Sequence, residues 1–259
     1  MEKTPIRLLA TNGLSRHYGG VIALSEVTMA VHPGQIFSLI GPNGAGKTTL
    51  FNCVTGLDKP TFGNVEFLGE PISGFRPDEV TALGIGRTFQ NIRLFADLTV
   101  LDNVKIGRHP RTKSTFIGSV FRTHRQQSEE ADITQHAHEM LTFVGLNDIS
   151  DQTAGNLSYG DQRRVEIARA LATEPKLLLL DEPAAGMNPQ ETQELIDLIY
   201  AIREQGVTVL LIEHDVKLVM QISDWVTVLD HGEKISEGEP ADVQNDERVI
   251  EAYLGVTDE

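Results

Sequence analysis

The sequence predicts an α/β fold in which helices cover both faces of a mostly parallel sheet. Apolar runs of strand length alternate with segments of helical periodicity near both ends of the chain, as in parallel strands joined by helices. The runs at 177–180 and 207–212 are almost entirely apolar, so we expect strands that are buried on both faces. Between about residues 97 and 175 the pattern is helical, which predicts an inserted helical lobe.

Each element follows from a local pattern. Alternating apolar residues on either side of Gly19 and Gly20 predict short strands of a small antiparallel β subdomain. A buried strand at 35–40 and an apolar helix after residue 48 flank a glycine-rich loop. Helices are predicted at 129–144 and 190–203 and after His214, and a further strand at 226–229.

We expect one domain over residues 1–259. Its α/β core occupies approximately 1–90 and 165–259, and the helical lobe occupies approximately 91–164. The chain is 40% hydrophobic with a mean hydropathy of −0.15, which is typical of a globular protein. No apolar run approaches the roughly 18–20 residues that span a bilayer.

The start of the chain has no basic segment followed by an apolar stretch, so we expect no secretory signal. Cys53 is the single cysteine and cannot form an internal disulfide; we interpret it as a small core residue in a reducing compartment. Both observations predict a cytosolic chain.

A phosphate-binding loop is the clearest motif. Residues 41–48, Gly-Pro-Asn-Gly-Ala-Gly-Lys-Thr, fit the pattern G-x-x-x-x-G-K-[ST] between a strand and a helix. Its glycines let successive backbone N–H groups point at phosphate oxygens, and the helix N-terminus behind them favours anions. Lys47 is expected to reach the β- and γ-phosphates, and Thr48 to offer its hydroxyl to Mg²⁺. We assign binding of ATP with Mg²⁺ to Gly41, Asn43, Gly44, Ala45, Gly46, Lys47, Thr48 and Thr49.

Two acidic residues follow the four leucines at 177–180. Asp181 ends this strand at the carboxyl edge of the sheet, where open parallel sheets bind their ligands. Acids in this position are usually a solvated strand end, but beside a phosphate loop they are the expected partner of Mg²⁺. We assign Asp181 to the Mg²⁺ shell, directly or through water, and Glu182 to polarising the attacking water.

Two further residues are catalytic candidates. His214 follows the apolar strand at 207–212, where it could contact the γ-phosphate or hold the water; most histidines in such places are structural. Gln90 lies where the sheet gives way to the helical lobe, and its neutral amide can contact Mg²⁺ or water. Most glutamines are surface residues, and Gln90 is chosen only because the other motifs are present.

The charge is strongly acidic and unevenly distributed. Lys and Arg total 22 and Asp and Glu 37, a formal charge of −15, which argues against a general nucleic-acid binder because phosphate backbones would be repelled. Residues 230–259 contain ten acidic and two basic residues, and we interpret this segment as solvated surface. The segment 103–128 has six basic and no acidic residues; it is either solvated surface or a cationic face toward anionic lipid.

Together with Leu157-Ser158-Tyr159-Gly160-Asp161-Gln162, these motifs resemble the nucleotide-binding subunit of ABC transporters, over essentially the whole chain. The resemblance implies a P-loop NTPase fold and a head-to-tail dimer, in which each ATP lies between one phosphate loop and the partner's signature. It implies that Ser158 and Gly160, in the signature with Asp161, contact the γ-phosphate of that ATP. It also matches Tyr18 to the aromatic residue that stacks on adenine.

Three positions depart from the family pattern Leu-Ser-Gly-Gly-Gln and from the Leu-Asp that usually ends the loop after the glutamate. Tyr159 and Asp161 replace a glycine and the glutamine of the signature, and Asn188 replaces the aspartate. The side chain of Tyr159 is expected to affect how closely the helix after the signature can approach the phosphate. Asn188 removes a charge from a loop that crosses the dimer interface in the family, so coupling between subunits is expected to differ.

The segments 86–95, 184–192, 212–220 and 252–255 resemble the larger ATPase of bacterial high-affinity branched-chain amino-acid importers. That resemblance implies a second ATPase subunit, paralogous or identical, two membrane permeases and, indirectly, a periplasmic or extracellular binding protein. It implies a peripheral location at the cytoplasmic face of the bacterial inner membrane. The basic stretch between Lys105 and Arg125 is similar in position to that subunit's extended lobe, which faces the permease and membrane.

Two alternatives remain open from the sequence. The same motor could serve another permease, for instance one that handles lipid or lipopolysaccharide. A soluble ATPase of this superfamily acting on ribosomes or DNA is disfavoured, because the chain has one cassette, no sustained heptads and a negative charge.

Overall fold

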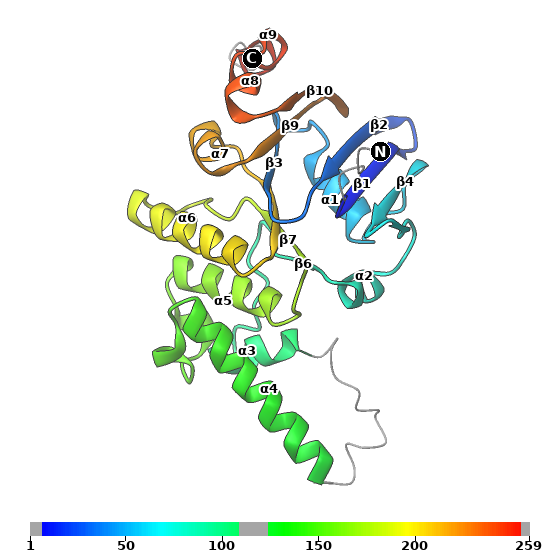
Figure 1. Cartoon of the computed structure of the whole chain (residues 1–259). Helices are drawn as coiled ribbons and strands as arrows, with labels where there is room; N and C mark the ends of the chain where they lie inside the picture. The colour runs from blue at the N-terminus through cyan, green and yellow to red at the C-terminus, as the bar shows by residue number, and fades with distance from the viewer. Residues whose placement is uncertain (1–6, 109–123, 255–259) are drawn as a thin grey trace, which may run out of the picture.

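The computed structural model describes residues 7–108 and 124–254, in which helices pack around two sheets (Figure 1). The central sheet has six strands, in the spatial order β10 (Glu233–Gly238), β9 (Trp225–Asp230), β3 (Ile36–Ile40), β8 (Thr208–Ile212), β7 (Leu177–Asp181) and β6 (Ile85–Arg87). All its neighbouring strands are parallel except β10, which pairs antiparallel with β9. The predicted mostly parallel sheet is therefore confirmed.

The second sheet is antiparallel and lies toward the N-terminal side of the molecule. Its strands have the spatial order β2 (Val21–Val31), β1 (Leu9–Tyr18), β4 (Phe62–Phe67) and β5 (Glu70–Pro71). Gly19 and Gly20 form the turn between β1 and β2, and Gly19 has a φ of 59°, a left-handed conformation that suits glycine. The antiparallel subdomain predicted from the first thirty residues is present.

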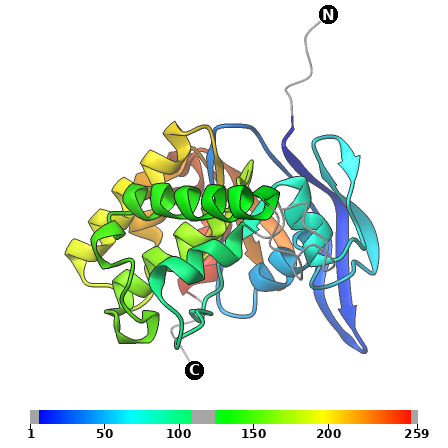
Figure 2. The same cartoon turned by 90° about the horizontal axis from the view of Figure 1, so that it is seen from below.

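Helices connect the strands of the central sheet and cover it. Their bounds are α1 (Lys47–Val54), α2 (Pro77–Leu83), α3 (Val100–Gly107), α4 (His124–Phe143), α5 (Tyr159–Leu171), α6 (Pro189–Glu204), α7 (Val216–Ile222), α8 (Pro240–Gln244) and α9 (Glu247–Leu254). Two short 3₁₀ helices, Asn147–Ile149 and Ala154–Asn156, precede α5. In Figure 1, α3, α4 and α5 gather in the lower part of the molecule, away from the antiparallel sheet, and Figure 2, seen from below, shows α4 in front.

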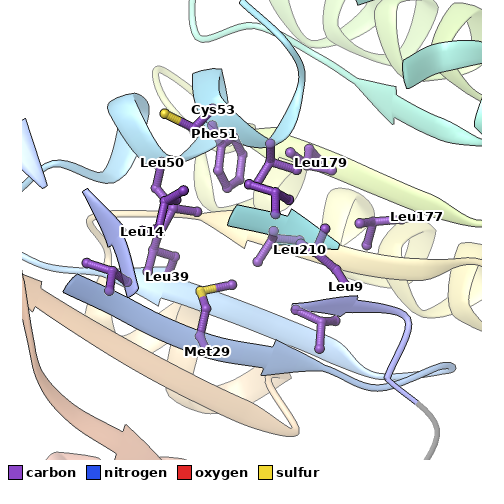
Figure 3. Close-up of a cluster of buried hydrophobic side chains, with 14 of the residues drawn as sticks. Leu9, Leu14, Met29, Leu39, Leu50, Phe51, Cys53, Leu177, Leu179 and Leu210 are labelled. Atoms are coloured by element: carbon purple, nitrogen blue, oxygen red, sulfur yellow. The ribbon is translucent and has the colours of Figure 1, made fainter. Parts of the chain in front are cut away.

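The sequence of strand β7 begins with four leucines because both faces of the strand are buried. Leu177 and Leu179 point into a core that strands β1, β2 and β3 share with helix α1, as Figure 3 shows. Leu178 and Leu180 point to the other face, into a core formed with helices α3 to α6. Because successive side chains of a strand alternate between faces, both sets of leucines in a strand that is covered on both sides are buried.

Cys53 is buried in the first of these cores, beside Phe51 on α1, and burial raises the pKa of its thiol to about 11. A pKa this high keeps the thiol protonated at neutral pH, so it acts as a small apolar side chain. The interpretation of Cys53 as a core residue is confirmed.

The structure differs from the sequence-based prediction in the acidic C-terminal stretch, and it leaves the lobe boundary and most of the basic stretch untested. The acidic C-terminal stretch forms β10, α8 and α9, and Val243 and Val249 within it are buried. Helix α5 crosses the predicted boundary at residue 164, and the division into core and lobe stays a prediction. Most of the basic stretch, residues 109–123, lies outside the described residues.

Among helices in the described ranges, none combines the length and hydrophobicity that crossing a membrane requires.

Candidate nucleotide site

The phosphate loop joins β3 to α1 and depends on three glycines with positive φ. Gly41, Gly44 and Gly46 have φ values of 149°, 82° and 100°. A Cβ atom at Gly41 would lie 2.0 Å from the carbonyl oxygen of Leu229, and one at Gly46 would lie 2.5 Å from that of Ala23. The loop is therefore pressed against β9 and β2, and a side chain at either position would force the backbone apart.

Helix α1 begins directly behind this loop. Its N-cap, Gly46, makes no side-chain capping bond, and the first turn contains no acidic residue. The first N–H groups of a helix have no partner within the helix and carry a partial positive charge. An uncapped N-terminus behind a glycine loop is thus suited to an anion such as phosphate.

Lys47 is the buried cation of the loop, with 7% of its surface exposed. Its Nζ donates to the carbonyl oxygens of Gly41 and Pro42 at 2.7 and 2.9 Å. Burial lowers the pKa of Lys47, while the negative charges of Glu182 and Asp181 act in the opposite direction. The structure therefore brings the loop lysine and the acidic end of β7 into one electrostatic environment, as the sequence predicts.

Asp181 ends β7 and forms a buried ion pair that the sequence analysis missed. Its Oδ2 accepts a hydrogen bond from Arg87 Nη2 at 2.9 Å, and the side chains of Arg87 and Asp181 are only 7% and 4% exposed. Burial raises the pKa of Asp181 above its ordinary value, and Arg87 opposes that rise. Arg87 also donates to Asn52 and Thr55 on and after α1, so it links the phosphate-loop helix to the acidic strand end.

The carboxylate of Glu182 lies next to the two other catalytic candidates, Gln90 and His214. Its Oε2 accepts a hydrogen bond from Gln90 Nε2 at 2.8 Å and lies 3.9 Å from Nδ1 of His214. The backbone of Glu182 has a φ of 47°, a left-handed conformation that is strained for a glutamate, and it is held there by a hydrogen bond from its N–H to Ile212. Three residues far apart in sequence, Gln90, Glu182 and His214, are thus brought together.

Glu213 accepts hydrogen bonds from backbone N–H groups next to Glu182 and His214. Its side chain is fully buried, and its two carboxylate oxygens accept from the backbone N–H groups of Ala184 and His214. Burial raises the pKa of Glu213, and both N–H groups oppose that rise. Glu213 therefore fixes the loop after Glu182 relative to the end of β8. Glu213 was not predicted as a site residue, and the one sequence feature that pointed to it is its position directly before His214.

Tyr18 lies at the end of β1 and is 42% exposed. Its hydroxyl donates to Asp58 at 2.6 Å, and the guanidinium of Arg16 stacks 4.3 Å from the ring centroid. These contacts fix the orientation of the ring, and Arg16 occupies one of its faces. Stacking of adenine on Tyr18 stays a prediction.

The signature turn caps helix α5. Ser158 is the N-cap: its hydroxyl accepts from the N–H of Asp161 and donates to the carboxylate of the same residue. A Cβ atom at Gly160 would lie 3.1 Å from Glu191 Oε1. Asn188 caps α6 and forms a reciprocal capping box with Glu191, so Asp161 and Asn188 each stabilise a helix start.

The donor set suits a magnesium nucleotide better than a metal bound by protein alone. No group of three or more His, Cys, Asp or Glu side chains within 7–108 and 124–254 is arranged to hold a metal ion. Mg²⁺ usually takes one or two protein carboxylates together with phosphate oxygens and water. Asp181 and the exposed Thr48 offer hard oxygen atoms of this kind.

A hollow of about 740 Å³ lies beside the phosphate loop. It is lined by Pro42–Ala45 of the loop and, across from them, by Asp230, His231, Ile235, Arg248, Glu251 and Ala252. Lys47, Asp181 and Glu182 are not among the residues that line it.

Comparison with protein families agrees with this geometry. Residues 24–185 match the family model described as ABC transporter. Residues 233–259 match a second model, described as Branched-chain amino acid ATP-binding cassette transporter.

Curated relatives match over nearly their whole length. The chain is 44% identical over 249 residues to the high-affinity branched-chain amino acid transport ATP-binding protein BraF of Pseudomonas aeruginosa, covering 96% of this chain and 98% of that protein. It is 43% identical, with the same coverage, to the high-affinity branched-chain amino acid transport ATP-binding protein LivG of Escherichia coli K12.

Solved structures are similar as well. A nucleotide-free ATP-binding cassette from an ABC transporter superposes with a TM-score of 0.84 at 34% identity, covering 96% of this chain and 99% of that one. An ATP-binding cassette in its ADP conformation gives the same TM-score at 33% identity and the same coverage. A dimeric cassette bound to ADP and Pi gives 0.75 at 26% identity, covering 90% and 98%.

Proposed function

This chain belongs to the ABC transporter family as an ATP-binding subunit, and we propose that it is the ATP-hydrolysing motor of an importer for branched-chain or related hydrophobic amino acids. The observation that carries the substrate class is the match of residues 233–259 to the branched-chain amino acid cassette model, joined by full-length relatives that transport these amino acids.

The phosphate loop is proposed to hold ATP. The N–H groups of residues 41–48 and the α1 N-terminus surround the phosphates, and Lys47 exchanges its bonds to the Gly41 and Pro42 carbonyls for phosphate oxygens. Thr48, Asp181 and Gln90 supply oxygen atoms for Mg²⁺. Bound there, Mg²⁺ would supply positive charge next to the phosphate oxygens.

Glu182 is proposed as the residue that orients and deprotonates the attacking water. Gln90 and His214 contact its carboxylate or lie beside it, so they hold it toward the γ-phosphate. Buried Glu213 holds the neighbouring loop, and the strained backbone of Glu182 keeps its side chain at the sheet edge. Such preorganisation is how a phosphoryl-transfer site lowers its barrier.

The working unit is proposed to be a head-to-tail dimer with a paralogue or a second copy. The exposed Ser158 and the neighbouring Gly160, at the N-terminus of α5, then contact the γ-phosphate bound by the partner. The dimeric relative supports such an assembly. Closure around ATP pulls on two membrane permeases at the cytoplasmic face of the membrane, and hydrolysis resets the pair.

Uptake measurements test this function. In a strain lacking the chromosomal copy, we expect Glu182→Gln to abolish uptake of labelled leucine, because the site still binds ATP but hydrolyses it too slowly. Glu204→Gln, an exposed glutamate at the end of α6, is the matched control and is expected to keep uptake.

Two results would contradict the proposal. Unchanged leucine uptake in the strain lacking this protein would reject the substrate class. Normal steady-state hydrolysis by the Glu182→Gln protein would reject Glu182 as the base.

A further inference from the structure

One face of helix α5 holds the segment that contains Gln90. Arg163, Glu166 and Arg169 recur every three residues along the helix and all contact segment 89–93. We call these three side chains the α5 clamp. It was not recognised from the sequence, because charged residues at this spacing usually form an exposed helix face.

Arg163 is the centre of the α5 clamp and is fully buried. Its Nη1 donates to the carbonyl oxygen of Phe89 at 2.5 Å and to Glu166 at 2.8 Å, while its Nη2 donates to the carbonyl oxygen of Gln90 at 2.7 Å. The planar guanidinium thus spans two successive backbone carbonyls. A lysine has the same charge but a single nitrogen, so it cannot reproduce this fork.

The other two members hold the far end of the segment. Glu166, which is 1% exposed, accepts from the N–H of Arg93 at 3.2 Å. Arg169 donates to the carbonyl oxygen of Arg93 at 2.6 Å. Because segment 89–93 is bound at both ends through charged groups, it has little freedom to move independently of α5.

Tyr159 joins the signature turn to the α5 clamp. Its hydroxyl accepts from Arg163 Nη2 at 3.0 Å. Its ring lies beside Gly186, where an added Cβ would meet a ring carbon at 3.6 Å. A glycine at position 159, the residue usual in the family's signature, offers neither contact, so this departure ties the turn both to segment 89–93 and to the loop after Glu182.

We propose that Arg163 and Tyr159 are positioning residues that link Gln90, beside the nucleotide of its own subunit, to the Ser158–Gly160 turn that meets the nucleotide of the partner. The side chain of Gln90 bonds to Glu182, its carbonyl bonds to Arg163, and Arg163 bonds to Tyr159 at the start of α5. A displacement of Gln90 on nucleotide binding is therefore transmitted to the signature turn. This inference rests on the proposed function.

Hydrogen–deuterium exchange of the isolated full-length chain tests the link without a partner subunit. Exchange is measured with and without Mg²⁺ and a non-hydrolysable ATP analogue. In the wild-type chain we expect exchange to change in peptides covering 41–48 and also in peptides covering 157–168. In Arg163→Lys we expect the change at 41–48 to persist and the change at 157–168 to be lost.

Arg164→Lys is the matched control, because Arg164 is the next residue of α5 but pairs with Glu194 on α6. It is expected to keep both changes. Tyr159→Phe is a second test variant: its ring is 45% exposed, so folding is preserved while the bond to Arg163 is removed. It is expected to reduce the change at 157–168, with analogue affinity as in the wild-type chain.

The possible failures are distinguishable. A wild-type change at 41–48 without one at 157–168 overturns the link, as does an undiminished change at 157–168 in both test variants. The absence of any change at 41–48 in the wild-type chain would instead overturn the nucleotide site itself.

Discussion

The buried ion pair between Arg87 and Asp181 leads to a quantitative prediction about stability. Arg87→Leu removes the guanidinium that lies 2.9 Å from the Asp181 carboxylate, while leucine keeps apolar contact with the neighbouring Phe51 and Phe89 rings. Asp181 is then a buried carboxylate without its charged partner. Breaking a buried pair in this way costs about 3–5 kcal/mol of unfolding free energy.

The cost of Arg87→Leu depends on pH, with a definite sign. Burial already raises the pKa of folded Asp181 above its ordinary value, and Arg87 opposes this rise. Without Arg87 the pKa rises further, so the folded carboxyl binds its proton more tightly than the unfolded one. The unfolded carboxyl is the same in both proteins, so the variant loses stability relative to the wild type as pH rises from the folded pKa of wild-type Asp181 to the higher folded pKa of the variant.

Urea unfolding over a series of pH values measures this effect. Arg76→Leu serves as the control, because Arg76 forms an exposed pair with Asp78 and is expected to leave stability nearly unchanged. The Mg²⁺ concentration for half-maximal ATPase activity should also rise in Arg87→Leu, since a protonated Asp181 is a poor ligand. A loss below about 1 kcal/mol that does not grow with pH would refute the reasoning, because the pair would then behave as a surface one.

Two further predictions concern the phosphate loop. Lys47→Ala removes a charged donor, and because such bonds contribute about 1.5–3 kcal/mol we expect ATP affinity by calorimetry to fall about 10- to 150-fold; unchanged affinity would reject the assignment. Gly41→Ala places a Cβ atom 2.0 Å from the Leu229 carbonyl oxygen, so we expect lower thermal stability and loss of ATP binding. Gly20→Ala, which meets open space, should leave both as in the wild type, and equal behaviour of the two variants would contradict the steric argument.

Features that depend on neighbouring residues and on the ends of parallel strands could be predicted from the amino-acid sequence. The phosphate loop is contiguous, so its glycines, Lys47 and flanking elements were readable directly. Asp181 and Glu182 were found because parallel strands place their carboxyl ends at one edge of the sheet, which the structure confirms. The continuously apolar runs identified these strands because both of their faces are buried.

Contacts between side chains that are distant in sequence could not be predicted and became visible only in the folded chain. Arg87 reaches Asp181 across 94 positions, and Arg163 reaches Phe89 across 74. No local periodicity encodes these pairs, because a charged residue has the same pattern whether it is solvated or buried against a partner. Burial therefore separated the α5 clamp from an ordinary charged helix face, and folding alone determined what Tyr159 contacts.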